Sequence, residues 1–343
     1  MLTYIRYNGT NSTVRGPNLG TIQGSKCGPL FYDIYSNDLH FLCSSDENIL
    51  FADDTCLVYA GESLELLVNH VNKRLSLIYD WCCFNKLSIN PSKSEYILLT
   101  NKHVSISPQL NIGGNNIRKV ECAKYLGVYI DHSLKYHNHI SSVKTKLSRF
   151  VGISYRLTSL FNYSTAKKFY YGCVYPAFNY CIGVWGGVLM CTERANDLLS
   201  LQRRIVKNLF TKFYQHDNGW IFASARIMKF NDVYRMCILK YMHKIIELRQ
   251  CPALRDNVIF RFPDHSYNTR NRGDILPPFP RVQVIKMNFE YQFITLWNNV
   301  PAYISNSSTI GIFKKRLIEY FLSSYWFFPF FAQKPQAPTG LLF

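Results

Sequence analysis

Asn48-Ile-Leu-Phe-Ala-Asp-Asp-Thr-Cys-Leu-Val-Tyr-Ala60 is the stretch of sequence on which the fold assignment depends. Two apolar runs, residues 49–52 and 56–60, flank Asp53 and Asp54, and this pattern predicts a β-hairpin with two carboxylates at its tip. Because the runs are apolar at successive positions, we expect both strands to lie in a buried sheet. Hairpin turns usually contain Asn-Gly or Asp-Gly, and this one has no glycine.

The two carboxylates at the tip suggest a cation site. Adjacent like charges repel one another, and a bound cation relieves that repulsion. Oxygen ligands favour Mg²⁺, and pairs of such ions catalyse phosphoryl transfer. Asp53 and Asp54 are therefore candidate metal ligands, although a solvated Asp-Asp turn would have the same sequence.

Composition and charge indicate a folded chain with a polyanionic partner. The 343 residues suffice for two or three domains, and 48% hydrophobic with 15% aromatic residues excludes a disordered polymer. The net charge of +17 makes nucleic acid the first candidate partner. Residues 131–215 hold 12 Lys and Arg against 3 Asp and Glu. A solvated helix face would also collect such charges, but three successive basic helices favour a nucleic-acid cradle.

Cysteine usage and hydropathy predict in which cell compartment the protein lies. The 11 cysteines include no Cys-x-x-Cys pair and no zinc-type spacing, so free thiols in a reducing compartment are expected. No secretory signal opens the sequence, and the most apolar run, 321–332, is short and interrupted by Pro329. These features predict a nuclear or cytoplasmic protein without a membrane span.

Periodicity and breakers predict the remaining elements. A glycine-rich turn at 20–28 precedes the first helix, and its glycines either admit a ligand close to the backbone or simply cap the helix. Gly127 lies inside a predicted strand, which indicates a bulge or the close approach of another backbone. The predicted helices are 29–42, 62–87, 139–161, 164–180, 192–214 and 309–322, with one or two more within 224–250. The predicted strands, besides a hairpin around 8–11, are 95–100 and 123–131. Residues 251–281 are predicted to be loop-rich.

Four short blocks identify a family resemblance. They are Gln23-Gly-Ser-Lys-Cys-Gly-Pro29, Phe51-Ala-Asp-Asp54, Asn85-Lys-Leu-Ser-Ile-Asn-Pro-Ser-Lys93 and Lys124-Tyr-Leu-Gly127. Their order and spacing resemble the reverse transcriptases of non-LTR (LINE-type) retrotransposons, jockey-like elements in particular. Segments 265–272, 296–301 and 313–317 look like the last part of those open reading frames, so the resemblance covers nearly the whole chain.

The resemblance implies an α+β fold: a partial right-hand polymerase palm, with an antiparallel sheet and helices, followed by a mainly helical thumb and C-terminal region. The implied domains are a partial palm at 1–131, a basic helical thumb-like region at 132–215, a mainly helical C-terminal region at 216–332 and a disordered tail at 333–343. The implied function is RNA-directed DNA polymerase, a template-directed nucleotidyl transfer. Its partners would be an RNA template, a DNA primer and deoxynucleoside triphosphates, with no membrane.

The resemblance also assigns roles to residues. Asp53 and Asp54 would bind Mg²⁺, and Lys93 would offset the charge of the leaving pyrophosphate. Gln23, Gly24, Ser25 and Phe51 would contact the nucleotide or template, and Tyr125, Leu126 and Gly127 would grip the primer end. The residues expected on the nucleic-acid backbone are Lys144, Lys146, Arg149, Lys167, Lys168, Arg203 and Arg204.

The sequence also departs from the family pattern. Ile22 occupies the place of a family proline, and the fingers, the strand with the first catalytic Asp and the endonuclease domain do not precede these blocks. Asp33 and Asp38 are the nearest acids after the first hairpin and do not resemble the missing motif. Because two-metal transfer needs carboxylates from two strands, we expect an incomplete Mg²⁺ site and a chain that is inactive alone. The alternatives are a non-catalytic basic nucleic-acid-binding remnant and a gene-model fragment.

Overall fold

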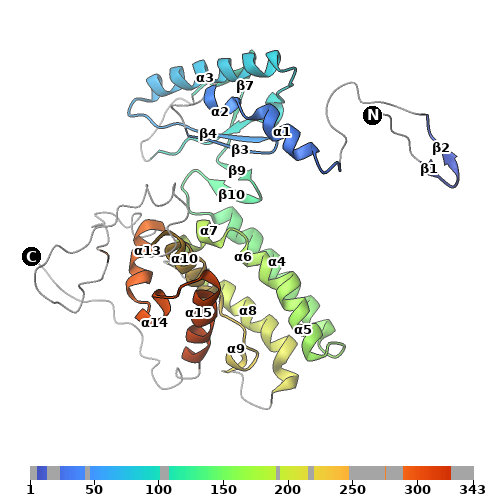
Figure 1. Ribbon diagram of the computed structural model, residues 1–343, viewed down its shortest axis with the longest axis vertical. Coiled ribbons are helices and arrows are strands. Elements are labelled where there is room, and N and C mark those ends of the chain that lie inside the picture. The colour runs from blue at the N-terminus through green and yellow to red at the C-terminus, as the bar shows by residue number, and fades with distance from the viewer. Residues whose placement is uncertain are drawn as a thin grey trace, which may run out of the picture. The chain divides into compact units, whose positions relative to one another are not determined.

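The structure is a computed structural model of all 343 residues, and residues 6–13, 24–42, 47–100, 108–190, 194–214, 220–246, 275 and 289–325 are described here. The chain divides into two compact units, 1–123 and 124–343, and each is described by itself (Figure 1). Gln23, the loop-rich segment around 251–281, apart from Ile275, and the predicted tail at 333–343 lie outside the described residues.

The described part of the first unit combines short strands with three helices. The small hairpin near the N-terminus is confirmed, with its turn at Asn8–Gly9. The elements are β1 (Arg6–Tyr7), β2 (Thr10–Asn11), α1 (Gly28–Ser36), α2 (Leu39–Leu42), β3 (Glu47–Phe51), β4 (Asp54–Val58), α3 (Leu64–Phe84), the 3₁₀ turn η1 (Pro91–Lys93), β5 (Glu95–Tyr96), β6 (Asn111–Ile112), β7 (Asn115–Asn116) and β8 (Arg118–Lys119).

Helix α3 organises the core of this unit. Val71, Leu75, Ile78 and Cys82 recur every three or four residues, and all four are buried. Ile78 and Cys82 pack with Leu39 of α2, while Val71 and Leu75 pack with Ile112 of β6. Leu57 of β4 contacts both groups, so α3 lies along one face of the β3–β4 hairpin (Figure 1).

The expectation that both hairpin strands are buried is wrong for one face of the hairpin. Leu50 and Leu57 point toward α3 and are half-buried. On the opposite face Ile49, Phe51 and Val58 are exposed by 50%, 61% and 46%. The two-residue period of a strand places these three side chains away from α3. The apolar run therefore marks a strand with one covered face only.

The described strands form two-stranded sheets, whereas the prediction was a larger antiparallel palm sheet. The β1–β2, β3–β4 and β6–β7 pairs are antiparallel hairpins, whereas β5 pairs with β8 in parallel. The predicted strand 95–100 is limited to Glu95–Tyr96. The mixed helix-and-strand class is confirmed, and the assignment to a polymerase palm and thumb stays a prediction, as do the predicted domain boundaries.

The second unit is mainly helical. It begins within a two-stranded sheet of β9 (Cys122–Tyr125) and β10 (Val128–Asp131). Its helices are α4 (His137–Leu157), α5 (Tyr163–Phe169), the π-helical turn η2 (Tyr170–Val174), α6 (Tyr175–Asn179), α7 (Ile182–Met190), α8 (Arg194–Phe210), the 3₁₀ turn η3 (Thr211–Phe213), α9 (Ile221–Ser224), α10 (Phe230–Ile246), α13 (Phe289–Asn298), α14 (Ala302–Ser305) and α15 (Ile310–Ser324).

Three predictions for this unit need correction. The single strand predicted at 123–131 is a hairpin, because Leu126 and Gly127 form a turn with φ of 44° and 83°. The helix predicted at 164–180 is α5 and α6 joined by the π-helical turn. Helix α7 is absent from the prediction, since its sequence Ile-Gly-Val-Trp-Gly-Gly-Val-Leu-Met has no polar face and hence no amphipathic period.

A large apolar core runs through the second unit. Tyr170, Phe178, Trp185, Phe210 and Phe230 are among its fully buried side chains. Gln202 is fully buried in this core, and its side-chain amide is hydrogen-bonded at both ends. Gln202 Nε2 donates to the Tyr170 hydroxyl at 2.8 Å and to Met228 O at 2.9 Å, and Gln202 Oε1 accepts from Phe230 N at 2.8 Å. These bonds join α8, η2 and the start of α10.

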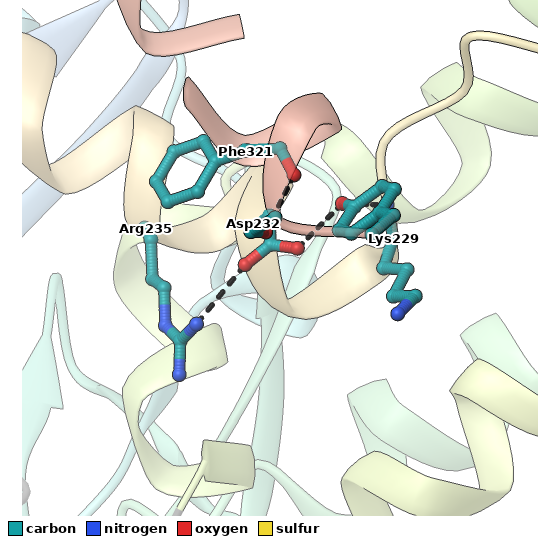
Figure 2. Close-up of polar contacts among 6 residues, drawn as sticks. Lys229, Asp232, Arg235 and Phe321 are labelled. Atoms are coloured by element: carbon teal, nitrogen blue, oxygen red, sulfur yellow. Dashed lines mark hydrogen bonds and ion pairs between the residues drawn. The ribbon is translucent and has the colours of Figure 1, made fainter. Parts of the chain in front are cut away.

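A second polar cluster joins the first turn of α10 to the C-terminal end of α15 (Figure 2). The Tyr325 hydroxyl donates to Asp232 Oδ2 at 2.5 Å and accepts from Lys229 N at 2.9 Å, while Arg235 Nη1 lies 3.0 Å from Asp232 Oδ1. Burial and the charge of Asp232 raise the pKa of Tyr325, so the phenol stays protonated and donates. The cluster therefore fixes the C-terminal end of α15 against the first turn of α10.

Among the described helices none is by itself both long and apolar enough to span a membrane. The consecutive pair Tyr163–Asn179 and Ile182–Met190 meets that condition only when taken together, across a bend of 73°.

Candidate active site

The tip of the β3–β4 hairpin carries the two aspartates. Phe51 pairs with Asp54, so Ala52 and Asp53 form a two-residue turn. The predicted hairpin with two carboxylates at its tip is therefore confirmed as a local structure. Asp53 lies in the turn, Asp54 begins β4, and both side chains are exposed.

The turn holds an unfavourable backbone conformation. Ala52 has φ of 51°, the left-handed region that costs an L-residue about 1–2 kcal/mol. Glycine adopts this conformation without that cost, yet the chain has alanine here. Strained residues of this kind cluster at functional sites, where the surrounding structure holds them in place. The strain supports a role for the tip beyond reversing the chain.

Helix α1 lies beside strand β3, because Asp33 and Ser36 of α1 line a hollow together with Asn48 and Leu50 of β3. Burial raises the pKa of the Tyr32 hydroxyl, and the negative charge of Asp53 raises it further. One helical turn later, the Tyr35 hydroxyl donates to the carbonyl oxygen of Asn85, just after α3. Helix α1 thus lies between the aspartate hairpin and the first residue of the block 85–93.

The glycine-rich turn leads directly into α1. Gly24 has φ of 84°, and a Cβ at this position would meet nothing within 4 Å, so this backbone is open to the surroundings. Ser25 Oγ accepts a hydrogen bond from Gly28 N at 2.9 Å and so satisfies a donor of the first helical turn. This bond supports the start of α1, and the predicted role of Ser25 in binding stays a prediction. Gln23 lies outside the described residues.

Lys93 ends the short turn that follows α3. Leu87 and Ile89 pack on the α3 core, and Asn90 Oδ1 accepts from Ser92 N at 3.1 Å and from Ser92 Oγ at 2.6 Å. Lys93 N donates to Asn90 O at 3.2 Å, and its side chain is exposed. Packing and hydrogen bonds hold this turn against the α3 core, and the ammonium group of Lys93 faces solvent.

The donor set at the tip fits one hard cation, not two. Asp53 and Asp54 offer carboxylate oxygens from a single hairpin, the ligand type that Mg²⁺ prefers together with water. Among the described residues, no group of three or more His, Cys, Asp or Glu side chains is placed to hold a metal ion. A two-ion site would need a further carboxylate from another strand.

The candidate primer grip is the turn of the β9–β10 hairpin in the second unit. Tyr125 ends β9, and Leu126 and Gly127 both have positive φ, as the favoured two-residue hairpin turn requires. The Tyr180 hydroxyl donates to Leu126 O at 2.6 Å, and its ring approaches to within 3.3 Å of the place that a Gly127 Cβ would occupy. Tyr180 therefore supports the turn, and no sequence signal pointed to it.

The predicted backbone-binding residues do not form one uniform cradle. Lys144 Nζ pairs with Asp197 Oδ2 at 2.7 Å, and Lys167 Nζ lies 5.3 Å from the centre of the Tyr163 ring. Arg203 is exposed, and its charge contributes, after burial, to the lowered pKa of Lys229. Arg204 instead lines a hollow between α4 and α8. The remaining predicted residues, Lys146, Arg149 and Lys168, are exposed.

The hairpin tip, the glycine turn and the β9–β10 turn carry the blocks that resemble reverse transcriptases, and comparison with known proteins confirms that resemblance. Residues 1–130 match the family model described as reverse transcriptase (RNA-dependent DNA polymerase). No solved structure matches the chain significantly.

The similar proteins come from non-LTR retrotransposons. A probable RNA-directed DNA polymerase from transposon X-element of Drosophila melanogaster is 26% identical over 59% of this chain and 23% of its own length. The RNA-directed DNA polymerase from mobile element jockey of the same species is 22% identical over 71% of the chain and 27% of its own length. A retrovirus-related Pol polyprotein from a type-1 retrotransposable element R1 of Nasonia vitripennis is 23% identical over 63% of the chain and 57% of its own length.

These matches define what the chain is related to. The chain is similar to parts of RNA-directed DNA polymerases from the X-element and jockey and of a Pol polyprotein from an R1 element, and its first 130 residues match the reverse transcriptase family model. The matched parts span about a quarter of the X-element and jockey proteins and just over half of the R1 protein.

Proposed function

We propose that this chain serves RNA-directed DNA synthesis of the non-LTR retrotransposon type by holding the catalytic cation, the incoming nucleotide and the primer end. The observation that carries the proposal is the position of α1. Asp33 and Ser36 of α1 line a hollow with Asn48 and Leu50 of β3, and Tyr35 donates to Asn85 O, so helix α1 brings its own block close to two others of the four. A chance set of motifs would not be expected to converge in this way.

The proposal gives each group a task. Asp53 and Asp54 hold Mg²⁺, which when bound neutralises phosphate charge. The open backbone at Gly24, with Ser25, Phe51 and Gln23, contacts the nucleotide or template, and Lys93 balances the triphosphate charge. In the second unit, Tyr125, Leu126 and Gly127 position the primer end. The exposed cations of α4, α5 and α8 bind the nucleic-acid backbone.

Nucleotide binding by the full chain tests this proposal. We expect a fluorescent deoxynucleoside triphosphate analogue to bind more tightly when Mg²⁺ is present, and the Mg²⁺ effect to vanish in Asp53→Asn. Asp80→Asn, on the exposed surface of α3, is the matched control and should behave as the parent chain does. Equal Mg²⁺ effects in the parent and Asp53→Asn would contradict the proposal.

Primer extension separates binding from catalysis. Because the described residues provide two carboxylates from one hairpin, we expect the chain alone to add no nucleotides to a primer on a homopolymer RNA template with Mg²⁺. Robust incorporation that disappears in Asp53→Asn would show that the site is complete, and our account of the donor set would be wrong.

A second function, non-catalytic binding of nucleic acid, is favoured by the basic helices. Binding through phosphates weakens steeply with salt, with a slope of about −0.9 per phosphate contacted on duplex DNA. Affinity that depends on salt but not on Mg²⁺ or Asp53 would favour this second function over the first.

A further inference from the structure

A hollow between α4 and α8 lies outside the segment matched by the reverse transcriptase family model. Its volume is about 310 Å³, close to the lower end of the range for small-molecule sites. The lining residues are Val151, Gly152 and Tyr155 of α4 and Arg204, Lys207 and Asn208 of α8. Its size suits one nucleotide better than the groove of a duplex.

The hollow is open because of Gly152 and is fixed at its base by Asn208. A Cβ on Gly152 would meet nothing within 4 Å, so the helix surface is recessed there. Asn208 Nδ2 donates to Ser154 Oγ at 3.0 Å and to Val151 O at 3.2 Å, and the Thr158 hydroxyl donates to Asn208 O at 2.9 Å. These bonds hold α4 and α8 together beneath the recess.

The rim of the hollow is positively charged. Arg204 and Lys207 line it from α8, while Arg149 and Arg156 lie three positions before and four positions after Gly152, on the same face of α4. Helix α4 contains no Asp or Glu, and Asp197, the acid of α8, pairs with Lys144. Among the residues that the structure describes, none forms an ion pair with any of these four cations.

An exposed aromatic ring stands at the same rim. Tyr155 is 76% exposed, although large aromatic residues usually bury most of their surface. Proteins that bind single-stranded nucleic acid combine a cationic groove, which follows the phosphates, with aromatic side chains on which bases stack. In a duplex the faces of the bases are already stacked on each other, so they are not available to Tyr155.

We propose that the α4–α8 hollow binds single-stranded nucleic acid, with one base stacked on Tyr155 and the neighbouring phosphates held by Arg204 and Lys207. Arg149 and Arg156 extend the phosphate path along α4. This site rests on the proposed binding of nucleic acid by the cations of α4 and α8, and it uses neither the aspartate hairpin nor the β9–β10 turn.

Fluorescence anisotropy of a labelled short oligothymidylate with the full chain tests the site. Tyr155→Ala should weaken binding by about 5- to 150-fold, the usual loss for one stacked base, whereas Tyr155→Phe, which keeps the ring, should bind within about twofold of the parent. An oligonucleotide of abasic sugar-phosphate units should bind the parent and Tyr155→Ala equally. Equal oligothymidylate affinities for parent and Tyr155→Ala would overturn the proposal.

Two further measurements locate the ligand in the hollow. Gly152→Leu fills the recess, so in this background Tyr155→Ala should no longer lower the affinity for oligothymidylate. Gly152→Ala leaves most of the recess open and should bind oligothymidylate as the parent does.

The salt dependence of binding tests the phosphate contacts. Arg204→Gln should reduce the slope of log affinity against log salt by about 0.7, the value for one phosphate of a single strand. Unchanged binding in Gly152→Leu, or a duplex that competes as well as the single strand, would refute the site. Circular dichroism and thermal unfolding confirm that each variant folds.

Discussion

At the scale of single residues, the aspartate tip combines exposure with strain. Asp53 and Asp54 are adjacent, exposed carboxylates, and the residue before them has a left-handed backbone that alanine adopts only at a cost. The sequence motif predicted both the turn and its acids. It could not predict the hydrogen bond of Tyr35 to Asn85 O, because that bond depends on how α1 packs against a residue 50 positions away along the chain.

Ala52→Gly should stabilise the hairpin. Relief of the left-handed strain gains about 1–2 kcal/mol, and the greater chain entropy of unfolded glycine offsets about 0.5–1 kcal/mol. The net gain, up to about 1.5 kcal/mol with a middle value of about 0.75 kcal/mol, should appear as slower amide hydrogen exchange in β3 and β4. Ala60→Gly, at a position without positive φ, should gain nothing. Faster exchange in Ala52→Gly would show that the left-handed turn is not strained.

Asp131 fixes the connection between β10 and α4 through its carboxylate. Its oxygens accept from Ser133 Oγ at 2.7 Å, Lys135 N at 2.9 Å and His137 N at 3.0 Å. Burial tends to raise the pKa of Asp131, but these hydrogen bonds, together with the nearby His137, hold it below its ordinary value. The intervening Leu134 and Tyr136 both have positive φ, so the turn depends on this carboxylate.

Asp131→Asn should therefore lower the free energy of unfolding by about 1–3 kcal/mol at neutral pH. Because the folded pKa is depressed, the contribution of Asp131 is fully present above the unfolded value of about 3.9 and is lost as pH falls through the folded pKa. Urea unfolding of both chains along a pH series measures the difference, which should shrink in acid. Ser133→Ala, which removes one of the three bonds, should show a smaller loss. A difference that does not change with pH would contradict this role.

At the scale of elements, helices and strands could be predicted where apolar residues recur at a regular spacing. Helix α3 was predicted within three residues at each end, since its apolar residues recur every three or four positions. Helix α7 was not predicted because Ile182–Met190 is apolar on all sides and contains three glycines. The split of 123–131 into two strands was also not predicted, because Leu126 in a positive-φ turn position is uncommon for a branched residue.

The glycines of α7 have a packing role that a substitution can measure. A Cβ on Gly186 would lie 2.6 Å from Cδ2 of the buried Tyr234 and 3.2 Å from Ile182 Cγ1. Gly186→Ala gains about 1 kcal/mol of helix propensity, but the overpacked contact with α10 costs about 1–3 kcal/mol. Gly152→Ala, where the added methyl meets nothing, has the gain without the cost.

Thermal unfolding of these two variants measures the contact between α7 and α10. We expect Gly152→Ala to be more stable than Gly186→Ala by the clash energy of about 1–3 kcal/mol. Equal stabilities would mean that Tyr234 moves aside freely and that α7 and α10 are loosely packed.

At the scale of the whole molecule, the chain has two units with different chemistry. The first carries the aspartate tip, and the second carries the buried helical core and the α4–α8 hollow. In the first unit Phe31, Ile34, Phe41 and Phe51 are exposed by 55%, 66%, 68% and 61%. Large exposed apolar patches favour association, so poor solubility without a partner stays a prediction. The family blocks identified the relatives correctly, whereas the site roles of individual residues remain to be measured.

Binding of Mn²⁺, a paramagnetic substitute for Mg²⁺, tests the central claim most directly: that the turn between β3 and β4 is a cation site. Electron paramagnetic resonance of free Mn²⁺ during titration with the full chain should show one site per chain. That site should be lost in the Asp53→Asn/Asp54→Asn double variant and kept in Asp80→Asn. Mn²⁺ binding that is unchanged in the double variant, or absent from the parent chain, would contradict the account.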